Sequence, residues 1–431
     1  MEETPLHPPP PERGGFRAAL GLLVRNHSFG RLYAAQLISY IGDWFLLVAL
    51  FGLVNDLTAS PAMVTLVLVV QMLSIAVFSP LGGHLADRFD RQRLMIGSDV
   101  ARMVLALGYL LIDEPGEVWL AYLLTAGIGA LTALFSPTST AAIPNLVAPG
   151  DLATANALSG SAWGSMLAVG GALGGLVAAV WGREAAFLGD ALSFAVSAAL
   201  LVGIKGSFSE PRAEEHPGLV EAVVETVRYA RQDHRVLALL SVKGGFGLAG
   251  GVMGLLPLLA LTVYQAGDTG TGILLATRGL GAVIGPFIAR RFADDLRGVF
   301  VAIGVAFAVY GAGYGTVAMV GSLGAAAVFV LVAHLGGGAQ WMLSTFALQR
   351  IVPDRIRGRV FAFDFGLVTL SLSCSILLAG WAAEHFPVQV VVAILAAVAV
   401  AYAVVWSLLT TPVRRRAHHP GVRARVDEEG V

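Results

Sequence analysis

The stretch GGHLADRFDRQR, from Gly82 to Arg93, lies between two long apolar runs at about residues 62–84 and 94–112. Each run is close to the roughly 20 residues that a helix needs to cross the hydrocarbon core of a bilayer. The stretch between them gathers three arginines and two aspartates, which are costly inside a bilayer. This pattern predicts two transmembrane helices joined by a short basic loop.

The composition extends this pattern to the whole chain. Of the 431 residues, 56% are hydrophobic and 13% are charged, against about 25% charged in an average soluble domain. Such a chain excludes a water-soluble enzyme, and no cofactor is indicated. The net charge of −1 gives no sign of a nucleic-acid partner, and the scattered histidines indicate no metal site. The single cysteine, Cys374, cannot form an intrachain disulfide.

Apolar runs broken by charge, proline and glycine predict twelve spans, which is an all-α membrane protein. The runs are too long, and alternate too little, for a β-barrel. The predicted spans are 31–54, 62–84, 94–112, 118–141, 156–180, 186–204, 236–264, 270–289, 298–318, 320–346, 359–383 and 386–410. The domains are an N-terminal tail (1–30, irregular up to Arg25), a six-helix half (31–205), a linker with an amphipathic helix (206–235), a second six-helix half (236–410) and a C-terminal tail (411–431).

Arginine and lysine predict the orientation of the chain. If the N-terminus is cytoplasmic, nearly all of these residues fall in cytoplasmic segments, and only Arg183 falls in an outer loop. The positive-inside rule then places both termini in the cytoplasm. For a bacterial chain the membrane is the inner, cytoplasmic one.

The two halves share one plan of six spans each. An even number of spans lets both halves enter from the same side, which predicts a parallel repeat related by a pseudo-two-fold axis, as in secondary transporters. The chain has no G-x-x-x-x-G-K-[ST] loop, so transport driven by ATP on this chain alone is not expected.

The quoted loop resembles the G-x-x-x-D-[RK]-x-x-[RK]-x-[RK] signature of the major facilitator superfamily, and it lies where that family places it, after the second span. The resemblance implies a gate that holds the two halves together, with the aspartate against span eleven. Its residues in this chain are Gly83, Asp87, Arg88, Arg91 and Arg93, and Asp364 near the inner end of span eleven is assigned to the same gate. A monomer is the default for this architecture.

Further stretches resemble the drug and siderophore exporters of that superfamily, typified by macrolide-efflux and enterobactin-exporter proteins. They are QLISYIGDWF (36–45), FSPT (135–138), IPNLV (143–147) and VPDRIRGRV (352–360). Span five carries Gly170, Gly171, Gly174 and Gly175, which resemble the glycine-rich antiporter motif of exporters, although the usual Gly-Pro pair is missing. Close helix packing by small residues is the structural alternative.

Charged residues inside the predicted spans of the first half need a physical reason. Asp43 is midway along span one and is the first candidate for a proton or cation site; the alternatives are a structural ion pair and a buried, neutral aspartate. Asp99 and Arg102 are three residues apart on one helix, which predicts a structural ion pair. Asp190, near the outer end of span six, is interpreted as a capping or snorkelling residue.

The second half carries its own polar candidates. Lys243 and Arg278 are expected either to bind an anionic group or to neutralise a carboxylate. His334 is a candidate proton carrier, and packing is its alternative. Gln340 and Trp341 are candidates for lining a cavity that holds an amphipathic substrate.

These observations predict a proton-coupled exporter of hydrophobic or amphipathic small molecules, with protons and membrane lipids as its other partners. Two alternatives stay open. One is a lysophospholipid or siderophore transporter or flippase without obligatory proton coupling. The other is a non-transporting membrane receptor on the same scaffold.

Overall fold

The computed structural model describes residues 16–204, 219–292 and 296–416. Within these ranges all regular elements are helical, and twelve spans are long and apolar enough to cross a membrane. The number of spans agrees with the sequence prediction. The chain is a multi-pass membrane protein.

Six long helices build the first half. They are α2 (His27–Thr58), α3 (Pro61–Arg88), α4 (Arg91–Gly108), α5 (Val118–Leu146), α6 (Leu152–Trp181) and α7 (Arg183–Val202). Single turns η1 (Tyr109–Leu111), η2 (Pro115–Glu117) and η3 (Pro149–Asp151) join some of them. The expectation of an irregular tail up to Arg25 is wrong in its last part, because Phe16–Arg25 forms the short helix α1. Leu22 of α1 is fully buried in a cluster with Phe29 and Leu32, which fixes this helix on the bundle.

The second half follows the same order. It contains α9 (His234–Ala249) continued by α10 (Val252–Leu258) and the π-helical turn η4 (Leu259–Val263), then α11 (Gly267–Ala289), η5 (Arg290–Phe292), α12 (Leu296–Val317), α13 (Leu323–Ile351), α14 (Asp354–His385) and α15 (Val388–Leu409). The predicted amphipathic helix of the linker is α8 (Leu219–Gln232), which packs on α9 and α14. The short α16 (Thr411–Arg416) follows α15.

Capping side chains begin several spans. Asn26 accepts from the Phe29 N–H at 3.0 Å to start α2, and Asp90 accepts from the Arg93 N–H at 2.8 Å to start α4. Ser60 caps α3 and is followed by Pro61, whose missing N–H costs nothing in a first helical turn. The basic loop of the opening stretch is therefore a tight turn between α3 and α4.

Span seven is broken near its middle. Gly250 ends α9, and a side chain of α14 takes over the main-chain bonding at the break: the Gly251 N–H donates to Ser375 Oγ at 3.0 Å, and that hydroxyl donates to the Leu248 carbonyl at 2.5 Å. Pro257, which has no N–H to donate, precedes the π-helical turn. The break couples the position of α9 to α14.

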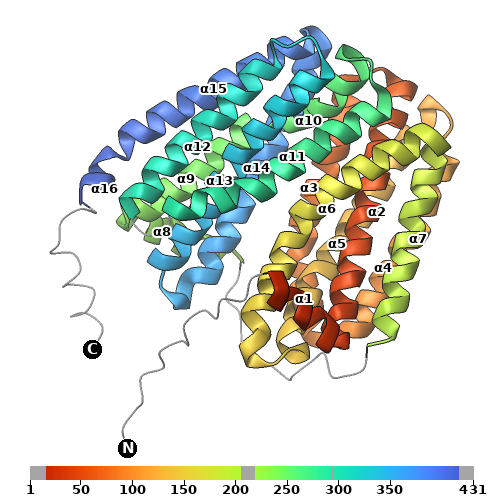
Figure 1. The fold of residues 1–431 in the computed structure, drawn as a ribbon, viewed down its shortest axis with the longest axis horizontal. Coiled ribbons are helices and arrows are strands. Elements are labelled where there is room, and N and C mark those ends of the chain that lie inside the picture. Colours follow the sequence, from red (N-terminus) through yellow and green to blue (C-terminus); the bar gives the residue numbers. More distant parts are fainter. Residues whose placement is uncertain (1–15, 205–218, 293–295, 417–431) are drawn as a thin grey trace, which may run out of the picture.

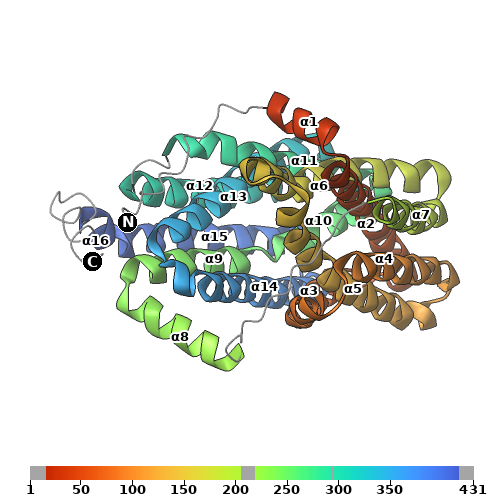
Figure 2. The ribbon, with the colours of Figure 1, turned by 90° about the horizontal axis from the view of Figure 1, so that it is seen from below.

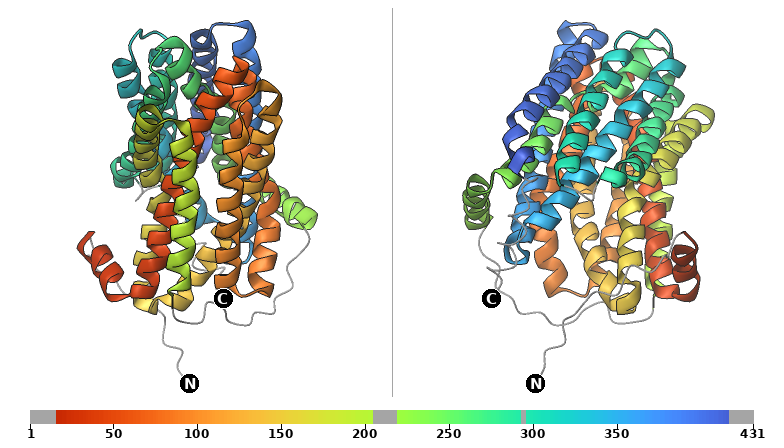
Figure 3. Two further views of the ribbon diagram at one scale, coloured as in Figure 1. Left: turned by 90° about the vertical axis from the view of Figure 1, so that its right-hand side faces the viewer. Right: turned by 60° about the vertical axis from the view of Figure 1, so that its left-hand side comes forward.

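The two halves stand side by side (Figure 1). We call the end of the molecule that carries α1, α8 and α16 the terminal face, and the opposite end the distal face. The halves converge toward the distal face and diverge toward the terminal face (Figures 1 and 3). They meet mainly through two helix pairs, α6 with α11 and α3 with α14, which lie on opposite sides of the bundle in the view from below (Figure 2).

The glycines of α6 make the contact with α11 possible. A Cβ on Gly175 would lie 2.7 Å from the Asp268 carbonyl oxygen, and a Cβ on Gly272 would lie 2.5 Å from the Gly171 carbonyl oxygen. Gly170 and Gly174 have the same role toward α2, where added Cβ atoms would meet Trp44 at 2.9 and 3.0 Å. Gly171 and Gly175 therefore face α11 of the other half, whereas Gly170 and Gly174 face α2 of their own half.

We expect Gly175→Leu to separate α6 from α11, because no space exists for a side chain between the two backbones. Overpacking of this kind costs about 1–3 kcal/mol, which should lower the melting temperature of the detergent-solubilised protein. Ala172→Leu, at an exposed position on the same helix, is the control and should leave the melting temperature unchanged. Equal melting temperatures for the two variants would contradict the close contact.

Candidate functional site

An ion-pair cluster joins the halves at the distal face. Arg183, the first residue of α7, donates from Nε to Asp268 Oδ2 at 2.9 Å and from Nη1 to Asp56 Oδ2 at 2.7 Å. Asp268 belongs to α11 and Asp56 to α2, so one guanidinium connects three helices and both halves. We call Arg183, Asp56 and Asp268 the distal clasp.

A second polar contact supports the distal clasp on the other helix pair. Ser60 at the start of α3 donates to Glu384 Oε1 at 2.5 Å near the end of α14. Deeper in the bundle, Val69 of α3 packs against Leu372 and Ile376 of α14. Further toward the terminal face a Cβ on Gly366 would meet no atom within 4 Å. The named contacts of Ser60 with Glu384 and of Val69 with Leu372 and Ile376 thus join α3 and α14 on the distal side of Gly366.

A buried charge cluster occupies the core of the first half. Arg102 on α4 is 1% exposed; it forms an ion pair with Asp99, donates to Ser39 Oγ at 3.3 Å, and lies over the rings of Phe135 and Phe194. The second carboxylate oxygen of Asp99 accepts from Ser197 Oγ at 2.7 Å. The spacing of three residues brings Asp99 and Arg102 together, and helices α2, α5 and α7 enclose them.

Two further carboxyl groups belong to this cluster and have no cation of their own. Asp43 on α2 is half-buried, within electrostatic reach of Arg102 and Asp99, and has no hydrogen-bond partner among the described residues. Asp190 on α7 is completely buried, and both of its carboxylate oxygens lack partners. The interpretation of Asp190 as a capping or snorkelling residue is therefore wrong. It lies seven residues inside α7, level with Gly42 of α2.

The core of the second half contains one closed ion pair. Lys243 Nζ on α9 is 2.6 Å from Asp364 Oδ2 on α14 and 3.0 Å from Thr345 Oγ1 on α13, and it lies 4.2 Å from the centroid of the Trp341 ring. Both charged side chains are buried. Lys243 thus neutralises the carboxylate of Asp364, and this ion pair lies entirely within the second half.

A tyrosine and histidine group lies beside Arg278. The Tyr314 hydroxyl is 2.8 Å from His334 Nε2, and the Tyr310 ring meets the His334 ring edge-on at 5.6 Å. Arg278 on α11 is half-buried, has these three side chains as electrostatic neighbours, and forms no salt bridge among the described residues. Arg278 thus places a guanidinium inside a span, and no carboxylate among the described residues pairs with it.

Gln340 and Trp341 are placed differently from each other. Gln340 is fully buried, and neither its amide oxygen nor its amide nitrogen has a hydrogen-bond partner among the residues that the structure describes. Trp341 is 38% exposed and stacks edge-on with Phe246 at 6.1 Å. The tryptophan therefore presents an accessible aromatic surface next to Lys243.

The loop motif lies at the terminal face, at the junction of α3 and α4. The surroundings of Gly83 and the side chains of Asp87 and Arg88 are outside the part that the structure describes. Arg91 is buried and Arg93 is exposed. Gln92 donates from Nε2 to the carbonyls of Leu201 and Ile204 at 2.7 and 3.1 Å, which ties this loop to the end of α7.

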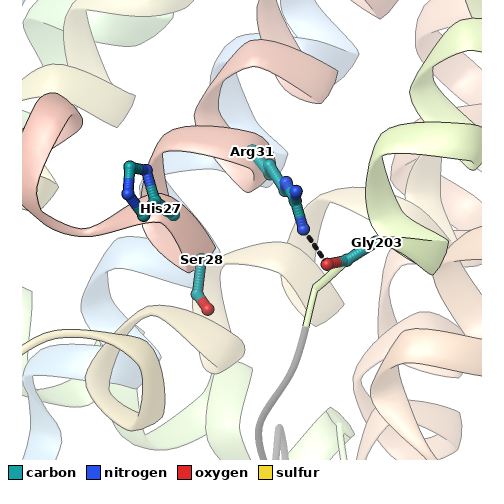
Figure 4. A pocket seen from close by; sticks show the side chains of 4 residues that line it. All are labelled: His27, Ser28, Arg31 and Gly203. Atoms are coloured by element: carbon teal, nitrogen blue, oxygen red, sulfur yellow. Dashed lines mark hydrogen bonds between the residues drawn. The ribbon is translucent and has the colours of Figure 1, made fainter.

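A pocket of about 390 Å³ opens at the terminal face beside α2 (Figure 4). His27, Ser28, Arg31 and Gly203 line it, and Arg31 donates to the Gly203 carbonyl. It is separated from the buried charges by the length of more than two helical turns of α2. We therefore place the candidate site at the intramembrane polar groups and not at this pocket.

Comparison with known proteins adds to this geometry. The family model described as transmembrane secretion effector, a branch of the major facilitator superfamily, matches residues 22–425. The chain belongs to this family. Its members are transporters and not enzymes, and the resemblance to the major facilitator superfamily is confirmed.

Several curated proteins are similar to this chain. An MFS-type transporter of Bacillus subtilis, YfiS, is 30% identical over 44% of the chain and 43% of its own length. Macrolide efflux protein A of Streptococcus pyogenes is 22% identical over 84% of the chain and 90% of its own length. The enterobactin exporter EntS of Citrobacter koseri is 26% identical over 66% of the chain and 71% of its own length.

Solved structures share the fold of this chain. A bacterial homolog of the human lysosomal transporter Spinster is 14% identical, with a TM-score of 0.71 over 91% of this chain and 96% of the other. The helical arrangement is thus that of the superfamily, as the sequence predicted.

We expect Arg183→Ala to loosen the distal closure, because it removes the one ion pair described between α7 and α11 and the ion pair of Arg183 with Asp56 on α2. The measurement is a pulsed electron-spin distance distribution between labels at the exposed Glu114 and Met319, one in each half, with Cys374 replaced by Ser. The distribution should broaden toward longer distances. Glu184→Ala, at the adjacent exposed residue, is the matched control, and identical distributions for the two variants would refute a clasp.

We expect Lys243→Met to destabilise the protein, because it leaves Asp364 buried without a cation. Removing one partner of a buried pair costs about 3–5 kcal/mol. The double variant Lys243→Met with Asp364→Leu should regain most of that loss in a thermal-unfolding assay. A double variant as unstable as the single variant would argue that the two side chains do not depend on each other.

Proposed function

We propose that this transporter is a proton-coupled exporter of hydrophobic or amphipathic small molecules in the bacterial inner membrane. In this proposal both termini are cytoplasmic, so the terminal face is the cytoplasmic one. The positive-inside rule supports this orientation. Exposed arginines such as Arg93, Arg228 and Arg291 lie at the terminal face, whereas Arg183 is the only described arginine at the distal face.

With this orientation, the structure is closed on the outer side and open toward the cytoplasm. The distal clasp and the contact of α6 with α11 close the outer side, while the halves diverge toward the cytoplasm. This is the arrangement of an exporter ready to receive a substrate from the cytoplasm or from the inner leaflet. Tilting the halves about their contact would then open the outer side, which is alternating access.

The observation that carries proton coupling is the shortage of cations in the buried charge cluster. Arg102 is the only described cation near the carboxyl groups of Asp43, Asp99 and Asp190. Its guanidinium already forms an ion pair with Asp99. A carboxylate without a cation or hydrogen-bond donor is expensive in a low-dielectric core and is more stable when it holds a proton. Asp43 is the half-buried member, so it is the one that a proton or a substrate can reach first.

The second half supports an amphipathic substrate. Trp341 and Phe246 offer aromatic surface for an apolar body, and Arg278 offers a guanidinium without a carboxylate for a polar or anionic group. Relatives named for macrolide efflux and enterobactin export support outward transport of molecules of this kind. His334, held by Tyr314, has a packing role in this proposal.

The proposal is tested in liposomes that carry a trapped pH dye. Macrolides, catechol siderophores, lipophilic cations and lysolipids are added across an imposed pH gradient. We expect a substrate-dependent proton flux in the wild type and its loss in Asp43→Asn, because an amide cannot bind and release a proton. Asp113→Asn, at an exposed aspartate in a distal loop, should behave as the wild type.

Two outcomes would contradict this function. Substrate movement without proton flux in the wild type would replace antiport by uncoupled lipid or siderophore movement. Unchanged proton flux in Asp43→Asn would remove Asp43 from the coupling role.

A further inference from the structure

Asp190 lies in the core of the first half, where a charge has no solvent. Its side chain is 0% exposed, and both carboxylate oxygens lack a hydrogen-bond partner within the described part of the chain. The neighbouring Ser193 hydroxyl donates to the main-chain carbonyl of Asp190 at 2.8 Å, and its oxygen can still accept a hydrogen bond from a protonated carboxyl. An ionised Asp190 would thus be both unsolvated and unpaired.

Arg102 is the only described cation near Asp190, and it already forms an ion pair with Asp99. From α2 Asp190 faces Asp43, with Tyr40 beside that residue, and from α4 it faces Arg102 and Tyr109. The Tyr109 hydroxyl is bound to Thr125 Oγ1 at 2.8 Å. The described part of α6, which also packs on α7, contributes no charged side chain.

The backbone of α2 brings Asp190 close to Asp43. A Cβ on Gly42 would lie 2.6 Å from Asp190 Oδ1 and 2.0 Å from Ser193 Oγ. The carboxyl of Asp190 therefore packs directly on the residue that precedes Asp43. Only a glycine at position 42 permits this approach, so the two acidic residues form one electrostatic unit on α2 and α7.

We infer that Asp190 is a second proton-binding residue of the transport cycle, protonated in the conformation seen here and buried behind Asp43. Asp43 exchanges protons with the side that is open, and Asp190 receives or gives up its proton through Asp43. A cationic or dipolar group of the substrate near Asp43 would stabilise the ionised form of both carboxyls and release the proton to the cytoplasm. This inference rests on the proposed proton antiport, whereas the protonation of Asp190 itself does not.

The first arm of the test measures protonation without transport. Infrared difference spectra of the reconstituted protein, recorded between acidic and alkaline buffer, should contain the carbonyl stretch of a buried protonated carboxylic acid. We expect Asp190→Asn to remove part of this band, and Asp113→Asn to leave it intact. Asp190→Asn should also keep the wild-type melting temperature at neutral pH, since the amide resembles the protonated acid in size and charge.

The second arm measures coupling in liposomes. We expect Asp190→Asn to lose accumulation driven by a pH gradient while it still moves substrate down the substrate's own gradient. A variant that keeps both the full infrared band and the full pH-driven accumulation would overturn the inference. A variant that loses its folded state would be replaced by Asp190→Glu, which should restore the band and the pH-driven accumulation if the carboxyl carries the proton.

Failure of the inference and failure of the proposed function give different results. If the wild type shows no pH-driven transport of any substrate, antiport is refuted, and the infrared band alone decides whether Asp190 is protonated. If the wild type is proton-coupled and Asp190→Asn is equally coupled, antiport stands and the role of Asp190 is refuted.

Discussion

The hydrocarbon core of a membrane cannot solvate a charge, so an ionisable side chain in the spans has to be paired, neutral or turned toward the interior of the bundle. Among the described residues, two ion pairs meet this constraint. Asp99 with Arg102 and Lys243 with Asp364 are closed pairs, one in each half. Asp43, Asp190 and Arg278 remain outside these pairs. Among the described residues of the spans, the first half thus has two carboxyl groups without an ion-pair partner, and the second half has one such guanidinium. This difference makes the interior of the first half acidic and that of the second half basic.

The contact between the halves is suited to movement. On α6 and α11 the backbones approach each other closely at glycines. The hydrogen bonds that hold the distal face closed are made by Arg183 and Ser60, near the ends of the helices where water can replace them. The two buried ion pairs of the core, Asp99 with Arg102 and Lys243 with Asp364, by contrast, each lie within a single half. Each half can therefore tilt as a unit, and a change in the protonation of the first half alters that half without breaking its core.

The sequence predicts those features that depend on local pattern. Hydropathy predicts the twelve spans, and a spacing of three residues on one helix predicts the contact of Asp99 with Arg102. Contacts between distant segments could not be predicted in this way: Lys243 and Asp364 are 121 residues apart, and the burial of Asp190 depends on the packing of α7 on Gly42. The distal clasp had a signal in the sequence, since Arg183 is the lone arginine among acidic outer loops. The helix α1 was missed because a polar, proline-rich start masks the short apolar run around Leu22.

The central claim is that the acidic excess of the first half is carried as bound protons that a substrate displaces. Its most direct measurement is the release of protons by the detergent-solubilised protein when a substrate is added in weakly buffered solution with a pH dye, with calorimetry to establish that the substrate binds. The account predicts a net release of protons in the wild type and none in a variant that combines Asp43→Asn with Asp190→Asn. Binding heat without proton release in the wild type would contradict it.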